Sequence, residues 1–383
     1  MLKKCIKCGL PETYETIIFN QDGICNICEG HKFKSENINW DERYGILEKL
    51  IDSHRGKYDY DCIIPFSGGK DSTYTLWYLV RKFKIKPLVV QFDHGFMRPT
   101  LKENNERTFK KLGVDVLSFS PNWKIVKRLM LEALKRKGDF CWHCHTGIFS
   151  YPMHIAIKFN VPLVFWGEPS SEYTAYYQYK DNEIEIVDEK RFNRYVNLGI
   201  TAEDMLSMIA HDIELEPRDL LPYTYPRLID LKKINYQSVC LGSFIPWDTK
   251  ENYKTINQEL GWQGDSVEGM PEDIYSYEKI ECYMQGVRDY IKYLKRGYSR
   301  VTQMTALDIR RGHMDREEAD RLIDSYEGRR PPSLDLFLSY VGLNETEFND
   351  ILKATVVPPY SPNFKNIKNG EKMWDYDSWF KEV

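Results

Sequence analysis

A run of six residues combines a flexible backbone with a charged pair: Ser67, Gly68, Gly69, Lys70, Asp71 and Ser72. It lies between an apolar run, "DCIIPF", and a segment with helical periodicity. Backbone N–H groups at the start of a helix have no intrahelical partner, and glycines let an anion approach them closely. Lys70 adds a positive charge, and Asp71 can cap the helix or orient a magnesium ion. The run therefore predicts a site for the phosphates of a nucleotide.

The order of these residues favours one kind of phosphate loop. The Walker A pattern requires Ser or Thr after the lysine, whereas Asp71 follows Lys70. The pattern Ser-Gly-Gly-x-Asp-Ser resembles the PP-loop of the ATP-pyrophosphatase superfamily. This resemblance implies cleavage of ATP between the α- and β-phosphates, with Mg²⁺, and adenylylation of an oxygen atom of the substrate. The alternative, a glycine-rich turn without a ligand, is disfavoured because all six residues match between a strand and a helix.

Two further strand ends carry polar residues. "VVQFDHGF" places Asp93 and His94 after one apolar run, and "VFWGEP" places Gly167 and Glu168 after another. The resemblance implies that Asp93 and His94 lie near adenosine; the alternative is an aspartate that caps the next turn. Gly167 would let the backbone approach the nucleotide. Glu168 would bind magnesium or act as a base, unless it is a structural carboxylate.

Four cysteines near the N-terminus have the spacing of a metal site: Cys5, Cys8, Cys25 and Cys28. Two Cys-x-x-Cys pairs separated by 16 residues match a structural zinc pattern. Four thiolates form a closed tetrahedral site, so the metal has no open position for catalysis. A segment with so few apolar residues would require the metal in order to fold. We expect Zn²⁺ here.

A third Cys-x-x-Cys pair, Cys141 and Cys144, precedes the helix that leads into the fourth predicted strand. Some sulfur-inserting PP-loop enzymes hold an iron–sulfur cluster at such a pair with one distant cysteine, and Cys282 is a candidate third ligand. The alternatives are a second zinc with a histidine, or a pair without metal that shapes a turn. Cys62 lies within a predicted buried strand, where it is expected to belong to the core.

Strands and helices must alternate to position these residues. Short apolar runs predict strands at 61–66, 87–92, 114–119 and 162–167, with helices at 71–83, 100–112, 122–137 and 147–159. We therefore expect an α/β fold of the PP-loop type, a parallel sheet with helices on both faces. The predicted units are a zinc module at 1–35, a linking helix at 36–58, a PP-loop domain at 59–248 and a mainly helical region at 249–383, which includes one helix over 277–297.

Composition limits the classes of function. The net charge of −4 argues against tight binding of nucleic acid, which requires a basic surface. The sequence shows no secretion signal and no apolar stretch that would insert into a membrane. With Cys-x-x-Cys pairs and no export signal, we expect a cytoplasmic protein.

Several segments together resemble the bacterial N-acetyl sugar amidotransferases: "CIKCGLPET…DGICNIC", "IIPFSGGKDSTYTLWYL", "DFCWHCHTGIFSYP" and "KIECYMQGVRDYIKYLKRGYSRVTQMTALDIRRGHMDREEA". The resemblance implies an enzyme that converts an acetamido group of a nucleotide-activated sugar into acetamidino for lipopolysaccharide or O-antigen synthesis. Lys70, Asp71 and Glu168 are the expected catalytic residues. Because Leu2 follows Met1 and no cysteine lies in a Gly-x-Cys-x-Gly elbow, we expect ammonia from a separate glutaminase, with a cyclase-like subunit that conducts it.

Two other interpretations remain open. A tRNA-thiolating PP-loop enzyme would use the same adenylylation, whereas a zinc-knuckle adaptor would leave the phosphate loop without a role. Arg98, Arg310 and Arg311 are candidates for contacts with an anionic substrate. Substitution of Lys70 by alanine is expected to abolish pyrophosphate release and to leave the fold intact.

Overall fold

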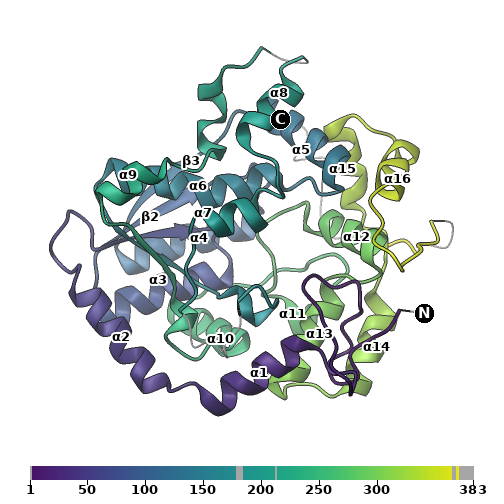
Figure 1. Ribbon diagram of the computed structural model, residues 1–383, viewed down its shortest axis with the longest axis horizontal. Coiled ribbons are helices and arrows are strands. Elements are labelled where there is room, and N and C mark those ends of the chain that lie inside the picture. Colours follow the sequence, from purple (N-terminus) through teal and green to yellow (C-terminus); the bar gives the residue numbers. More distant parts are fainter. Residues whose placement is uncertain (1, 178–183, 212–213, 365–367, 371–383) are drawn as a thin grey trace.

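A five-stranded parallel sheet forms the centre of the molecule (Figure 1). The computed structural model describes residues 2–177, 184–211, 214–364 and 368–370. The strands lie in the order β3-β2-β1-β4-β5, and every neighbouring pair is parallel. Their bounds are β1 Cys62–Phe66, β2 Pro87–Phe92, β3 Asp115–Phe119, β4 Leu163–Trp166 and β5 Gln237–Cys240. The predicted α/β fold class is confirmed.

The two faces of the sheet are covered by different helices, because successive side chains of a strand point to opposite sides. Ile64 of β1 packs in the core that includes α3 (Lys70–Phe83), α4 (Pro99–Leu112) and α10 (Thr249–Leu260). Ile63 packs in the core on the side of α6 (Trp142–Lys158). Helix α10 belongs to the region predicted as a separate helical part, yet it completes one layer of the sheet.

The order of the strands identifies a place for ligands. The chain passes outward from β1 through β2 to β3 and then returns to β4, on the other side of β1. In open parallel sheets, ligands bind beyond the carboxyl ends of the strands at the point where the order reverses. Here that point lies between the ends of β1 and β4, which carry the glycine-rich loop and Glu168.

Two helices differ from their predicted bounds, and both changes affect the cysteines. Helix α6 begins at Trp142, so Cys144 lies in its first turn and not before it. The helix predicted over 277–297 begins only at Gln285 as α12 (Gln285–Arg296). The preceding segment is irregular because Lys279 has φ +54° and Cys282 forms an isolated antiparallel bridge with Met97. Residues 277–284 are therefore held by contacts with the sheet domain.

The N-terminal cysteine segment packs beside α13 (Arg300–Arg311) and α14 (Arg316–Tyr326), as Figure 1 shows. The ring of Tyr14 lies 5.0 Å from that of Tyr298, and Nη1 of Arg316 donates a hydrogen bond to the carbonyl of Cys5. The segment leads into α1 (Asn26–Asn37) and then α2 (Trp40–Asp52). The predicted boundary at residue 35 thus lies inside α1.

The remaining helices surround this arrangement. Helix α12 packs with α5 (Trp123–Lys137), α15 (Ser333–Val341) and α16 (Glu345–Lys353) around a shared apolar cluster. The other helical segments are shorter: η1 Ser170–Glu172, α7 Glu189–Arg191, η3 Phe192–Val196, α8 Ala202–Ile209, η4 Pro217–Tyr223, α9 Leu228–Lys233, η5 Leu241–Ser243 and α11 Glu272–Tyr275.

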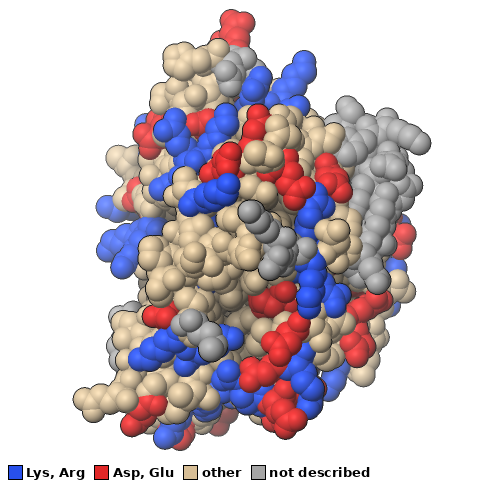
Figure 2. Space-filling model, turned by 90° about the vertical axis from the view of Figure 1, so that its right-hand side faces the viewer, with Lys and Arg blue, Asp and Glu red and all other residues tan. Residues whose placement is uncertain are grey.

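On the face drawn in Figure 2, positive and negative side chains are interspersed around an area of uncharged residues. Within the described part of the chain, no helix combines the length and the apolar character that crossing a bilayer requires.

Candidate active site and metal centre

The glycine-rich loop connects the end of β1 to the start of α3, as the sequence predicts. Gly68 has φ +86°, a conformation that residues with a side chain rarely adopt. The loop is closed by two hydrogen bonds, from Gly68 N to Ser72 Oγ at 3.2 Å and from Gly69 N to Ser67 Oγ at 3.3 Å. The N–H groups of the first turn of α3 have no intrahelical acceptor, as at any helix start. Together with the helix dipole they make this loop a site for anions.

Both glycines of the loop are in close contact with residues from other elements. A Cβ at Gly68 would lie 2.3 Å from Asn105 Oδ1, and a Cβ at Gly69 would lie 1.9 Å from Glu281 Oε1. Asn105 Oδ1 and Glu281 Oε2 are buried without a hydrogen-bond partner among the described residues. Glycine is therefore required at both positions, and two polar groups lie against the loop.

Lys70 does not present a free positive charge. Its ammonium is buried and lies 2.9 Å from Asp71 Oδ2 and 2.6 Å from Glu278 Oε2. Burial lowers the pKa of Lys70, but the two carboxylates outweigh it and raise the pKa well above its usual value. Conversely, although burial raises the pKa of Glu278, Lys70 lowers it to about 2. Lys70 therefore joins the loop to residues 277–284, so its removal would disturb the fold as well as the site.

Glu168 and Asp71 form a pair of carboxylates at the ends of β4 and β1. Burial, followed by the charge of Asp71, raises the pKa of Glu168 to about 8. Oδ1 of Asp71 and Oε1 of Glu168 are buried, and no described residue donates a hydrogen bond to them. Two buried carboxylate oxygens without partners fit a hard cation such as Mg²⁺, which prefers oxygen ligands. These residues therefore meet the requirement for the predicted magnesium site.

The other predicted strand-end residues also lie at this edge of the sheet. Gly167 packs against α3, because a Cβ there would lie 2.8 Å from Thr75 Oγ1 and 3.0 Å from the carbonyl oxygen of Asp71. Asp93 accepts a hydrogen bond from Gly95 N at 2.8 Å, so it caps the following turn as the alternative interpretation proposed. His94 is buried, and burial lowers its pKa.

One cavity of about 160 Å³ brings the loop, the histidines and the three remaining candidate cysteines together. Ser67 and His94 line it from the ends of β1 and β2, and Glu281 lines it from the segment before α12. Its further lining includes His143, Cys141, Cys144 and Cys282. The grouping of these cysteines beside the loop, which the sequence proposed, is thus present in the fold.

The three cysteines of this cavity do not have the spacing of ligands to one zinc ion. Zn–S bonds of about 2.3 Å in a tetrahedron place the sulfurs about 3.8 Å apart. Among the described residues, only the N-terminal cysteines form a group of three or more ligands within 4.8 Å of one another. Burial raises the pKa values of Cys141, Cys144 and Cys282. The spacing of these cysteines therefore does not match a zinc site in this structure, and a metal or an iron–sulfur cluster at them stays a prediction.

The N-terminal cysteines form a cluster that could hold a metal ion, as the sequence predicts. Cys5, Cys8, Cys25 and Cys28 are all buried with their sulfurs within 4.8 Å. Sγ of Cys8 lies 3.7 Å from Sγ of Cys25, close to the edge of a zinc–thiolate tetrahedron of about 3.8 Å. The N–H of Cys25 donates to Sγ of Cys5 at 3.3 Å. The donor set and its spacing fit a closed structural zinc site.

The arginines considered for substrate contacts all have partners inside the protein, which corrects that prediction. Arg98 forms an ion pair with Asp265 at 2.9 Å, and Arg311 forms one with Glu172 at 2.8 Å. Arg310 is buried beside the cysteine cluster. Burial lowers its pKa, but the sulfurs of the cluster outweigh this and raise it. Arg310 therefore offsets the negative charge of the thiolates.

A buried ion-pair network connects the metal centre to the active-site edge. Glu172, which follows β4, pairs with Lys34 of α1 and with Arg311 of α13. The hydroxyl of Tyr14 donates to the carbonyl of Tyr173 at 2.8 Å. Because Glu168 lies just before these residues, the N-terminal segment supports the position of Glu168.

Sequence reasoning missed the polar residues that approach the loop from other elements: Asn105, His143, Glu278 and Glu281. Glu278 and Glu281 flank the left-handed Lys279 in a segment with helical periodicity. No local signal in such a segment distinguishes it from a helix. Only the sheet contact through Met97 fixes its path.

The parallel sheet and the loop at its switch point define an α/β protein of the PP-loop class. Residues 272–379 match the family model "LPS biosynthesis protein WbpG-like, C-terminal domain". The match covers less than a third of the chain, and the matched region contributes Glu278, Glu281 and α12 to the site. The resemblance to enzymes of surface-glycan synthesis is confirmed at this level.

A shorter match links the chain to an uncharacterized protein of Methanocaldococcus jannaschii. The two are 36% identical over 85 residues, which is 22% of this chain and 30% of the relative. The chain thus matches less than a third of that protein's length.

Two solved structures resemble the chain weakly. NMN synthetase from Francisella tularensis has 12% identity and a TM-score of 0.31, with 72% of this chain and 94% of that chain covered. The U34-tRNA thiolase NcsA from Methanococcus maripaludis with its [4Fe-4S] cluster has 12% identity and a TM-score of 0.32, with 95% and 100% covered. Likeness of this degree establishes neither a shared ligand nor a shared reaction.

Proposed function

We propose that the protein is an ATP-dependent amidotransferase that converts an acetamido group of a nucleotide-activated sugar into acetamidino for surface-glycan synthesis. The observation that carries this proposal is the convergence of three parts of the chain at the phosphate loop, where Ser67 and Glu281 also line one cavity. The glycine-rich loop supplies a phosphate site, Glu168 and Asp71 supply carboxylates, and the WbpG-like region supplies Glu278 and Glu281.

The chemistry requires activation of a poor leaving group. The amide oxygen attacks the α-phosphorus of ATP and pyrophosphate departs, which leaves an O-adenylylated imidate. Ammonia adds to the carbon of this imidate, the C–O bond breaks, and AMP leaves with the original amide oxygen. The product is an amidine, and atoms and charges balance over the two steps.

The residues of the site have separate roles in this proposal. The N–H groups at the start of α3 bind the departing pyrophosphate. Asp71 and Glu168 would hold Mg²⁺, which supplies neutralisation of phosphate charge. Lys70 positions Asp71 through its ion pair. Glu168 is assigned to Mg²⁺, because a buried carboxyl group with a pKa of about 8 is mostly protonated near neutral pH unless a cation binds it.

Ammonia is proposed to come from a separate glutaminase subunit, with a cyclase-like subunit that conducts it. The cysteines that line the loop cavity do not support an internal glutaminase, because burial raises the pKa of each thiol and a glutaminase needs an activated thiolate. Accordingly, the chain alone should use ammonium salts and should not hydrolyse glutamine.

The N-terminal centre is proposed to hold zinc in a structural role. Its four sulfurs are buried and closed to solvent, so no open ligand position faces the loop.

A second candidate, tRNA thiolation, is favoured by one observation, the presence of Cys141, Cys144 and Cys282 in the cavity of the loop. The net charge of −4 disfavours it. Retention of tRNA by the purified protein, or a mobility shift of added tRNA, would support thiolation.

The test of the proposal is a screen of nucleotide-linked diacetamido sugars with ATP, Mg²⁺ and ammonium chloride. The expected result is an amidine product, one mass unit lighter than the amide, with AMP and pyrophosphate in equal amounts. Pyrophosphate release that is independent of every sugar, or an absence of amidine with all of them, would refute the proposal.

A further inference from the structure

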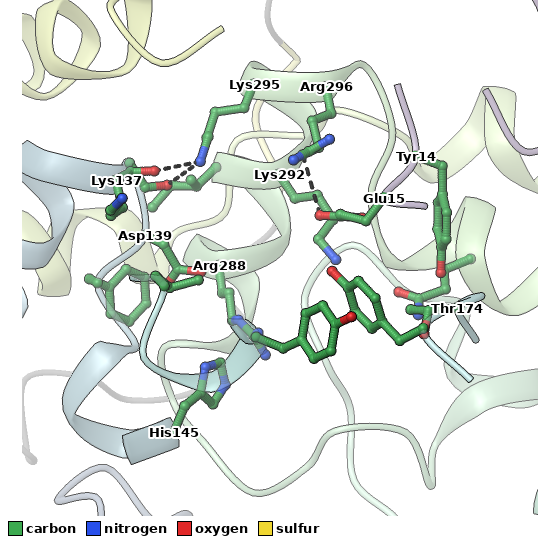
Figure 3. A pocket seen from close by; sticks show the side chains of 17 residues that line it. Tyr14, Glu15, Lys137, Asp139, His145, Thr174, Arg288, Lys292, Lys295 and Arg296 are labelled. Atoms are coloured by element: carbon green, nitrogen blue, oxygen red, sulfur yellow. Dashed lines mark hydrogen bonds and ion pairs between the residues drawn. The ribbon is translucent and has the colours of Figure 1, made fainter. Parts of the chain in front are cut away.

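A second, larger cavity adjoins the loop cavity and has a strong positive character. Its volume is about 440 Å³, within the range of small-molecule sites of about 300–1,000 Å³. It lies between the N-terminal segment, the α5–α6 junction and α12 (Figure 3). The two cavities share Phe140, His145 and Arg288 in their walls. A molecule bound here can therefore reach toward the loop.

The charges that line this cavity are unbalanced. Five lysines and arginines line it, Lys137, Arg288, Lys292, Lys295 and Arg296, against two carboxylates, Glu15 and Asp139. Several attractions outweigh the effect of burial and lower the pKa of Glu15 to about 2, so this carboxylate is ionised. Asp139 also has a lowered pKa. The lining of the cavity therefore has three more basic than acidic side chains.

Two basic side chains at the centre of the cavity have acidic neighbours, Glu15 for Lys292 and Asp139 for Arg288, but no direct ion pair with them. Arg296 pairs with Glu15 at 3.3 Å, and Lys295 donates to two backbone carbonyls. Among the described residues, the side chains of Arg288 and Lys292 form no hydrogen bond or ion pair, although the ammonium of Lys292 lies 5.6 Å from the centroid of the Tyr298 ring. Figure 3 shows both side chains directed toward the same open space. Burial lowers the pKa of Lys292, and repulsion from Arg300 and Arg288 adds to this effect, which the attraction of Glu15 only partly offsets. A bound anion would relieve this repulsion.

An aromatic pair forms another part of the wall. The rings of Tyr176 and Tyr195 are stacked with centroids 3.7 Å apart, and both residues line the cavity. Stacked tyrosines offer a flat surface on which a nucleobase packs without a specific hydrogen bond. A polyanion without a base, such as free pyrophosphate, would not use this surface.

We infer that this cavity binds the nucleoside diphosphate of the acceptor, with Arg288 and Lys292 on the phosphates and Tyr176 and Tyr195 beside the base. The sugar then passes His145 toward the loop cavity, where its acetamido group meets ATP. The orientation of the sugar toward the loop cavity rests on the proposed function, whereas the binding of a nucleoside diphosphate in this cavity does not. A diphosphate-linked sugar carries two negative charges and a CMP-linked sugar only one, so the excess of positive charge favours the diphosphate.

The experiment measures binding of UDP-N-acetylglucosamine, UDP, UMP, uridine and pyrophosphate to the full chain by calorimetry. The expected affinity falls from UDP to UMP to uridine, and pyrophosphate binds more weakly than UDP. Arg288→Gln and Lys292→Met should each weaken UDP binding about tenfold or more, because each removes a charge-assisted contact. Tyr195→Ala should weaken UDP binding more than pyrophosphate binding.

Two variants serve as controls. Lys110→Met removes the same charge from an exposed side chain of α4 and should leave UDP binding unchanged. Ser72→Ala alters the phosphate loop and should weaken ATP binding but not UDP binding. Equal UDP affinity in all variants, loss of UDP binding only in Ser72→Ala, or no binding of any probe would overturn the inference.

A measurement on the unmodified protein covers the case in which a variant does not fold. UDP should slow the acylation of Lys292 by an amine-reactive reagent, followed by mass spectrometry, and should leave Lys110 unprotected. Absence of protection would contradict the inference. UDP binding without any cleavage of ATP would instead refute the proposed function but would support this binding site. Turnover that is unaffected by Arg288→Gln and Lys292→Met would refute the binding site alone.

Discussion

At the scale of single residues, the site is defined by carboxylates whose charges are only partly compensated. Asp71 is paired with Lys70, whereas Glu168 has a buried oxygen without a partner and a pKa of about 8. A carboxyl group in such surroundings is either protonated or bound to a cation. Because the protonation of Glu168 differs between the folded and unfolded states, its raised pKa can be tested by measuring stability as a function of pH.

The first prediction concerns Glu168→Gln. Between pH 4.5, the usual pKa, and about 8, the folded protein retains a proton on Glu168 that the unfolded chain has lost. Stability therefore falls as pH rises through this interval, and the variant lacks this loss. We expect the melting temperature of the wild type to fall relative to the variant from pH 4.5 to 8, measured by differential scanning calorimetry without metal. A difference in melting temperature between wild type and variant that stays constant from pH 4.5 to 8 would show that the pKa of Glu168 is not raised.

The second prediction concerns the buried pair of Lys70 and Glu278. Lys70→Met removes the closest cation of the buried Glu278 and leaves it only the longer ion pair with Arg300 at 3.6 Å, which should lower the free energy of unfolding by about 3–5 kcal/mol. This corrects the expectation that a small residue at position 70 leaves the fold intact. Urea titrations would measure the effect, and the double variant Lys70→Met/Glu278→Gln should recover part of the loss.

A matched control is Lys110→Met, since Lys110 forms an exposed pair with Glu106 and should contribute less than about 1 kcal/mol. If Lys70→Met unfolds at the same urea concentration as this control, the pair does not stabilise the fold.

At the scale of elements, the alternating strands and helices were predictable because their apolar periodicity is local. The residues at which α6 and α12 begin could not be predicted in this way. Tyr277, Ile280 and Met284 recur at helical spacing, yet Lys279 adopts a left-handed conformation and Cys282 pairs with Met97. Contacts with the sheet thus override the periodicity of this segment, and they bring Glu278 and Glu281 to the loop. For the same reason the sequence identified the loop but not the residues that approach it.

The third prediction concerns the N-terminal segment as an element. Cys25→Ser should release the metal, since a closed site needs all four sulfurs. Because Tyr14 and Lys34 hold the residues after Glu168, amide exchange at 169–175 should then accelerate. Elemental analysis and hydrogen-exchange mass spectrometry would measure the two effects.

The control for this experiment is Cys282→Ser, which should retain one zinc per chain. Full zinc content in Cys25→Ser would contradict the assignment of the centre, and unchanged exchange at 169–175 would contradict its supporting role.

At the scale of the whole molecule, the N-terminal cysteine segment, the sheet domain and the WbpG-like region meet around the phosphate loop and the cavity that adjoins it. The sheet domain contributes the phosphate loop with Asp71 and Glu168, and the C-terminal region contributes Glu278, Glu281 and α12. The N-terminal segment contributes Tyr14 and Glu15 to the adjoining cavity. The sequence indicated these three parts separately. Their convergence depends on contacts between residues more than 100 positions apart, such as Lys70 with Glu278, which periodicity and spacing do not encode.

The central claim is that the loop directs transfer of AMP to an amide oxygen. The most direct test follows an acetamido sugar labelled with ¹⁸O in its carbonyl through turnover with ATP and ammonium, with ³¹P NMR and mass spectrometry of the products. The account predicts that the label leaves in AMP, one ¹⁸O for each amidine formed. Formation of ADP, or of AMP without the label, would contradict it.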